Sequence, residues 1–177
     1  HIYLTADRLP GPDAPRARFT LAHELGHYYL DDHRTALAEG RAPAHRSVCD
    51  HESVLLPEQE ADLFAACLLM PADRFIARAR ALPTGLAAVI QLADHFGASL
   101  TAAAIRYAQC NLACCAVVKW DHAGYAWKKL SSTAFDRQYR RTIESPARLI
   151  PDGPTARALA GAESALVVGA RHVEKGN

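Results

Sequence analysis

The sequence has little that marks a membrane protein, a nucleic-acid-binding protein or a disulfide-stapled protein. No apolar run approaches the ~20 residues that a membrane span requires. The 20 basic and 19 acidic residues leave a formal net charge of +1, so nothing demands nucleic acid, a membrane surface or an acidic partner. What the chain does have is 177 residues, 50% of them hydrophobic. That is enough for one core with a small appended lobe.

The five cysteines form no even disulfide framework. They are Cys49, Cys67, Cys110, Cys114 and Cys115. The last three lie close together in the sequence, but their spacing matches no common zinc motif. Cys67 falls in an apolar helical run, where a free thiol behaves as a small hydrophobic group. We therefore expect reduced thiols and a cytoplasmic protein.

Two strongly patterned helices are predicted in the first part of the chain. From Phe19 onward, apolar residues recur at intervals of three and four, as on one face of a helix. A second helix is predicted from Pro57 to the residue before Pro71, with acidic residues near its start, where the helix dipole favours them. The polar segment 31–53 is predicted to be a loop with one short helical turn at 34–39.

Gly26 interrupts the apolar stripe of the first helix. A glycine inside a helix is less favourable than alanine by about 1 kcal/mol. Its presence predicts that another element approaches the first helix closely at this point.

Short helices and then a β-hairpin are predicted further along. The helices are expected at 72–81, 85–96 and 100–109, the last two joined at Gly97 in a hairpin that resembles a helix–turn–helix. The segments CAVVKW and YAWKKL, separated by DHAG, predict a pair of strands.

The predicted elements divide the chain into two parts. We expect a core over residues 1–110, with the helical hairpin at 84–110, and a small α/β extension over 111–177. A helix is predicted at 133–143, and the sequence after Pro146 is only weakly patterned.

The stretch RFTLAHELGHYYL carries the clearest chemical pattern. His23 and His27 are four residues apart and so share one helix face, where both imidazoles can reach one metal ion. Glu24 is turned by about 100° from His23, close enough to reach a metal-bound water without being a ligand. The pattern predicts a zinc site in which Glu24 is the general base.

A catalytic zinc needs a third protein ligand, and the second helix offers candidates. Glu60 shares a face with four less polar residues, Leu63, Phe64, Cys67 and Leu68. A carboxylate on such a buried face is costly unless it is paired or bound to a metal. Glu58 lies on a more mixed face, so Glu60 is the predicted third ligand, with a solvated helix acid as the alternative.

Two segments resemble the ImmA/IrrE family of bacterial zinc metallopeptidases. These are RARFTLAHELGH and EQEADLFAACLLMP, which together cover about the first 70 residues. The resemblance implies an α+β, zincin-like fold, mainly helical with a small β-sheet. It implies that His23, His27 and Glu60 bind Zn²⁺ and that Glu24 is the catalytic base. The sequence departs from the family pattern at Asp31, where many members have histidine.

The resemblance also implies the reaction and its partner. Zinc would lower the pKa of its water, and Glu24 would take the proton as the water attacks a peptide carbonyl. The expected substrate is a protein, a helix–turn–helix repressor of the phage-repressor type, cleaved in a stress or mobile-element response. Three residues are open candidates for oxyanion stabilisation: Tyr28, His33 and His45. Asp62 is either a partner that orients a ligand histidine or a solvated helix acid.

Two other functions remain alternatives on the sequence alone. One is a metal-binding regulator that holds a partner repressor without cleaving it. The other is a DNA-binding regulator, but the second helix of the hairpin has one basic residue, Arg106, and phosphate contacts need several. No direct contact with nucleic acid or a membrane is therefore expected, and the oligomeric state is left open.

The sheet expected for a zincin-like fold is thin in this sequence. Such enzymes bind substrate as an added strand at a sheet edge, yet residues 2–5 form the only strand candidate before the first helix. The chain begins with His1 rather than Met. We expect either further residues upstream or a contribution from the C-terminal hairpin.

Overall fold

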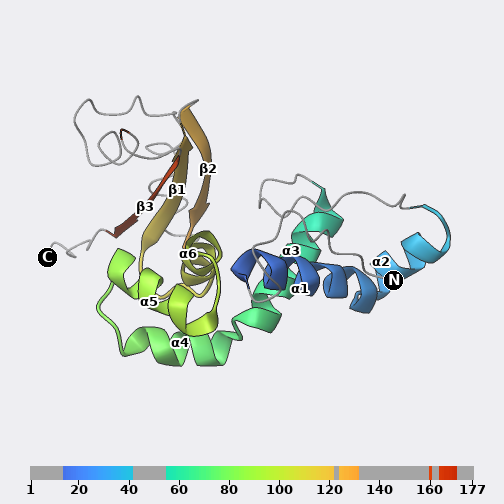
Figure 1. The fold of residues 1–177 in the computed structure, drawn as a ribbon, viewed down its shortest axis with the longest axis horizontal. Coiled ribbons are helices and arrows are strands. Elements are labelled where there is room, and N and C mark those ends of the chain that lie inside the picture. Colours follow the sequence, from blue (N-terminus) through green and yellow to red (C-terminus); the bar gives the residue numbers. More distant parts are fainter. Residues whose placement is uncertain (1–13, 42–54, 122–123, 132–159, 161–163, 171–177) are drawn as a thin grey trace, which may run out of the picture. The chain divides into compact units, whose positions relative to one another are not determined.

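The computed structural model describes residues 14–41, 55–121, 124–131, 160 and 164–170 (Figure 1). Several sequence predictions fall elsewhere and lie outside the described residues. These are the strand candidate at 2–5, the helix at 133–143, Cys49 and His45.

The described residues form a mainly helical chain with a small antiparallel sheet, which confirms the predicted fold class. The helices and strands are α1 (Pro15–Tyr29), α2 (Asp31–Ala38), α3 (Leu56–Leu69), α4 (Ala72–Arg80), α5 (Leu86–Phe96), α6 (Leu100–Gln109), β1 (Cys115–Asp121), β2 (Gly124–Leu130) and β3 (Ser164–Ala170). Prolines lie in the first turns of α1 and α3, where no intrahelical N–H is needed.

Helix α2 corrects the prediction that residues 31–53 are loop. Residues 31–38 are helical, and the helix starts directly after the end of α1 at Leu30. Asp31 and Asp32 occupy its first turn, where the partial positive charge of the helix start favours carboxylates. That pair of acids was the available signal, but the polar composition of the segment obscured it.

Helices α1 and α3 pack closely through small residues. A Cβ atom added to Gly26 would lie 3.1 Å from the Ala61 Cα atom and 3.3 Å from the Ala61 carbonyl oxygen. Phe19, Ala22 and Ala65 continue this contact as a buried apolar cluster. The close approach predicted from Gly26 is therefore confirmed, and it brings the backbones of the two helices together around the histidine pair.

Contacts between Cα atoms divide the chain into two compact units. One consists of residues 1–75 with 94–99, and the other of 76–93 with 100–177. The first contains the α1–α3 pair. Within it, the Arg18 Nη1 atom donates hydrogen bonds to the carbonyl oxygens of Phe96 (3.2 Å) and Gly97 (3.0 Å). The division into a 1–110 core and a 111–177 extension stays a prediction.

The second unit is built around the central strand β1. The strand order is β2-β1-β3 with antiparallel pairing on both sides, and the pairing of β1 with β2 confirms the predicted hairpin. Helix α6 packs against β1 and β2, and seven of its residues, 102–108, are buried. β3 falls in the segment whose patterning was too weak to predict a strand.

No single helix among the described residues is long and apolar enough to cross a membrane. The bent pair of α5 and α6 meets the length and composition criterion only when its two helices are counted together.

Candidate metal centre

His23 and His27 lie on the side of α1 that faces α3, as their four-residue spacing predicts. Both residues are buried, and the His23 side chain is only 1% exposed. Their Nε2 atoms are 3.1 Å apart. The helix therefore brings two imidazole nitrogens to one point inside the protein.

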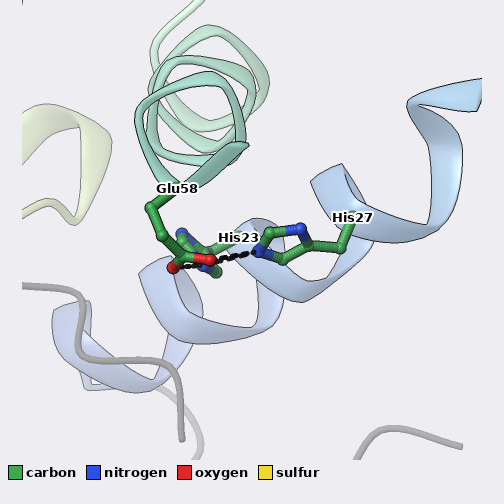
Figure 2. A group of neighbouring side chains, drawn as sticks. All are labelled: His23, His27 and Glu58. Carbon is green, nitrogen blue, oxygen red and sulfur yellow. Dashed lines mark hydrogen bonds and ion pairs between the residues drawn. The ribbon is translucent and has the colours of Figure 1, made fainter. Parts of the chain in front are cut away.

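Glu58 of α3 supplies a carboxylate at the same point, as Figure 2 shows. Its Oε2 atom is 3.3 Å from His23 Nε2, and its Oε1 atom is 3.4 Å from His27 Nε2. Three ligand atoms, one from each residue, lie within 4.8 Å of one another. Tetrahedral coordination at ~2.0–2.1 Å places neighbouring donor atoms about 3.4 Å apart, so the observed spacing fits a zinc ion.

The structure does not bring Glu60 to the histidine pair. Its side chain is 49% exposed, whereas that of Glu58 is 10% exposed. The prediction of the buried face of α3 was therefore wrong, because α3 packs against Gly26 with its small residues, Ala61 and Ala65. Glu58 is three residues before Ala61 and shares that face, whereas Leu63, Cys67 and Leu68, grouped with Glu60, are exposed.

Asp62 orients the first histidine. Its Oδ1 atom is 2.9 Å from His23 Nδ1. A carboxylate only accepts hydrogen bonds, so His23 Nδ1 carries the proton and donates it to Asp62. In a neutral imidazole the Nε2 lone pair is then directed at the centre. Of the two roles left open for Asp62, the geometry favours the orienting one.

The charges around the centre act on the two histidines in opposite directions. Burial alone would lower the pKa of His23, but the hydrogen bond and charge of Asp62, aided by Glu58 and Glu24, raise that pKa above 6.5. Burial and the nearby charge of His23 lower the pKa of His27. The surrounding carboxylates therefore favour one positive charge, on His23, whereas a second proton on the neighbouring His27 is disfavoured.

Glu24 is half-buried, and its charge acts on both histidines. It lies next to the centre without belonging to the three-residue group, which is where a general base is needed. Of the three oxyanion candidates, His45 lies outside the described residues. Tyr28 is 58% exposed, and both ring nitrogens of His33 are engaged by His27 and Glu60. The role of oxyanion stabiliser stays unassigned.

Two histidines four residues apart on one helix, with a buried glutamate from a second helix, define a site of the metallopeptidase class. The family model described as the IrrE N-terminal-like domain, Peptidase_M78, matches residues 12–107. This chain belongs to that family, which confirms the resemblance seen in the sequence. A search of curated proteins returned no match.

Proposed function

We propose that this protein is a zinc-dependent endopeptidase in which His23, His27 and Glu58 hold the metal and Glu24 is the general base. The single observation that carries the proposal is the convergence of two imidazole nitrogens and a buried carboxylate at 3.1–3.4 Å. Nitrogen and oxygen donors in this number are typical of catalytic zinc, which keeps a further position open for water or substrate.

The residues of the chain divide the work between them. Two imidazoles and one carboxylate would hold the ion, and Asp62 keeps the His23 ring in the orientation that presents Nε2. Zinc, when bound, supplies Lewis acidity that activates a water molecule and polarises the peptide carbonyl. Glu24 accepts the proton of that water and passes it to the leaving amine, so the peptide bond is hydrolysed without a covalent intermediate on the protein.

The test is to separate metal binding from proton transfer. Glu24→Gln keeps the size of the side chain but removes its basicity. We expect it to retain zinc, measured per chain by elemental analysis, and to lose cleavage of an unfolded model protein such as casein by a factor of at least 100. Unchanged cleavage by Glu24→Gln would contradict the assigned base, and a zinc-free wild-type protein would contradict the metal site.

We further propose that the natural substrate is a helix–turn–helix repressor of the phage-repressor type, in a stress or mobile-element response. Family membership supports this proposal. Co-expression with candidate repressors, followed by mass spectrometry of the fragments, tests it. A fragment that appears with the wild-type protein and not with Glu24→Gln would identify the substrate.

A regulator that binds a repressor and does not cleave it is the alternative. Relief of repression that persists in Glu24→Gln would favour this alternative. DNA binding is disfavoured because Arg106, the one basic residue of α6, is only 6% exposed. A side chain buried in this way cannot neutralise phosphates, which account for most of the affinity of such proteins.

A further inference from the structure

His33 lies between the metal centre and Glu60. It belongs to the first half of α2, and its side chain is 5% exposed. Its Nδ1 atom is 3.1 Å from His27 Nδ1, and its Nε2 atom is 2.9 Å from Glu60 Oε2. Both ring nitrogens therefore contact side chains: Nδ1 contacts His27 of the metal centre, and Nε2 contacts the half-exposed Glu60.

The carboxylate of Glu60 fixes the direction of this chain of hydrogen bonds. A carboxylate only accepts, so the hydrogen between Glu60 and His33 is carried by His33 Nε2. Neutral His33 then has a lone pair on Nδ1 and accepts a hydrogen bond from His27. His27 must accordingly carry its proton on Nδ1, which leaves its Nε2 lone pair available.

The metal centre requires the same arrangement from the opposite end. His27 Nε2 is the atom that faces His23 and Glu58, and a metal binds only an unprotonated nitrogen. A neutral imidazole that binds metal through Nε2 has its hydrogen on Nδ1 and must donate it. His33 Nδ1 is the acceptor at hydrogen-bonding distance.

We propose that His33 is a positioning residue that, with Glu60 behind it, holds His27 in the orientation and tautomer that bind the metal. This inference rests on the proposed zinc site. The two ligand histidines are then held in different ways. His23 donates directly to the carboxylate of Asp62, whereas His27 donates to an imidazole that itself donates to the carboxylate of Glu60.

The experiment compares the zinc affinity of the full chain and its variants by competition with a chromophoric chelator. His33→Phe keeps a ring and removes both nitrogens. His33→Asn retains an oxygen near the position of Nδ1, so it can still accept from His27. His33→Gln places its amide nearer the position of Nε2 and lacks that acceptor. His95→Phe is the matched control, because His95 is an exposed histidine of the described residues.

We expect His33→Phe to weaken zinc binding about 10- to 100-fold, as loss of a partner of a ligand histidine typically does. His33→Asn should recover most of that loss, and His95→Phe should change nothing. Long-range ¹H–¹⁵N spectra of the zinc-loaded wild-type protein should show His27 protonated on Nδ1 and His33 protonated on Nε2. Zinc on Nε2 by itself requires the His27 hydrogen on Nδ1, so the results specific to positioning are the His33 tautomer and the rescue by asparagine. A role of His33 in packing alone would predict neither.

Zinc affinities of His33→Phe and wild type that agree within twofold would overturn the inference, as would a His27 ring protonated on Nε2. If His33→Phe does not fold, the comparison of His33→Asn with His33→Gln decides, and equal affinities of the two contradict the role. A wild-type protein that binds no zinc would overturn the proposed function as well. Tight binding by every variant would overturn the positioning role only.

Discussion

Two groups of histidine and glutamate lie close together in the described part of the chain, and they differ in burial and in the contacts of their glutamates. In the first, Glu58 is buried between His23 and His27. In the second, Glu60 is half-exposed and contacts His33. The glutamates are two residues apart on α3, and a helix turns by about 200° over that interval. Position around the helix, rather than nearness in sequence, therefore separates the proposed metal ligand from a supporting residue.

The largest difference between the two groups is expected when each carboxylate is replaced by an amide. We expect Glu58→Gln to weaken zinc binding by a factor of about 100 or more, since ~10–16 kcal/mol of zinc binding shared among three or four ligands is about 2.5–5 kcal/mol for each. Glu60→Gln keeps an oxygen that accepts from His33, so its effect should stay within a few-fold. Isothermal titration with zinc measures both. Equal losses in the two variants would mean that the groups are not distinct.

Widening the contact between α1 and α3 should damage both groups together. Gly26→Leu places a side chain where Ala61 backbone atoms lie 3.1–3.3 Å from a first added carbon. Overpacking of this kind typically destabilises by about 1–3 kcal/mol. Urea unfolding of the metal-free protein measures the loss, and zinc affinity should fall with it.

Leu21→Met is the control for this change, because Leu21 is an exposed residue of the same helix. It should leave both stability and zinc affinity nearly unchanged. A Gly26→Leu variant as stable as wild type would show that the two helices separate easily, and the close approach would then not explain the choice of Glu58.

A change that loosens the first unit away from both groups should affect stability alone. Arg18→Met removes two hydrogen bonds from a charged donor to the carbonyl oxygens of Phe96 and Gly97. We expect a loss of about 1–2 kcal/mol in the free energy of unfolding, with zinc affinity unchanged. Arg16 is an exposed arginine two residues earlier in the same helix, so Arg16→Met is the control and should change little. A fall in zinc affinity in Arg18→Met would contradict the separation.

The smallest expected effect concerns the surroundings of the second group. Cys67 is exposed and lines a cavity of about 440 Å³ together with His33 and Glu60. A maleimide attached there should change zinc affinity only a few-fold, because it touches the supporting residues and not the ligands. Loss of zinc from the labelled protein would indicate that residues of this cavity are part of the metal centre.

Cys115 provides the internal reference for that labelling. It is buried, and burial, only partly offset by the hydrogen bond of Ser131, raises the pKa of its thiol above 9.0. The reactive form is the thiolate, so at about pH 8 a raised pKa slows the reaction. Peptide mapping should find Cys67 labelled well before Cys115, and the gap should narrow as the pH rises. Early labelling of Cys115 would indicate opening of the second unit.

The local features of this protein could be predicted from its sequence. The spacing of His23 and His27 depends only on the helical repeat, and the approach of another element at Gly26 follows from an absent side chain. The β1–β2 hairpin follows from alternation, the end of α5 from a glycine stop at Gly97, and the start of α6 from a capping residue. These features are local, so neighbouring residues are sufficient to specify them.

Which glutamate meets the histidines depends on how the helices pack in three dimensions. Helix α3 carries apolar residues around most of its circumference, and Leu56, Leu63 and Leu68 remain exposed, so apolar content alone does not mark the inner face. The inner face of α3 is determined by the helix against which it packs. Gly26 of α1 leaves room for the face of α3 that carries Ala61 and Ala65, and Glu58 lies on that face. The same packing places His33 of α2 between His27 and Glu60. The physical reason is that close packing depends on the shapes of both surfaces, and one helix sequence specifies only one of them.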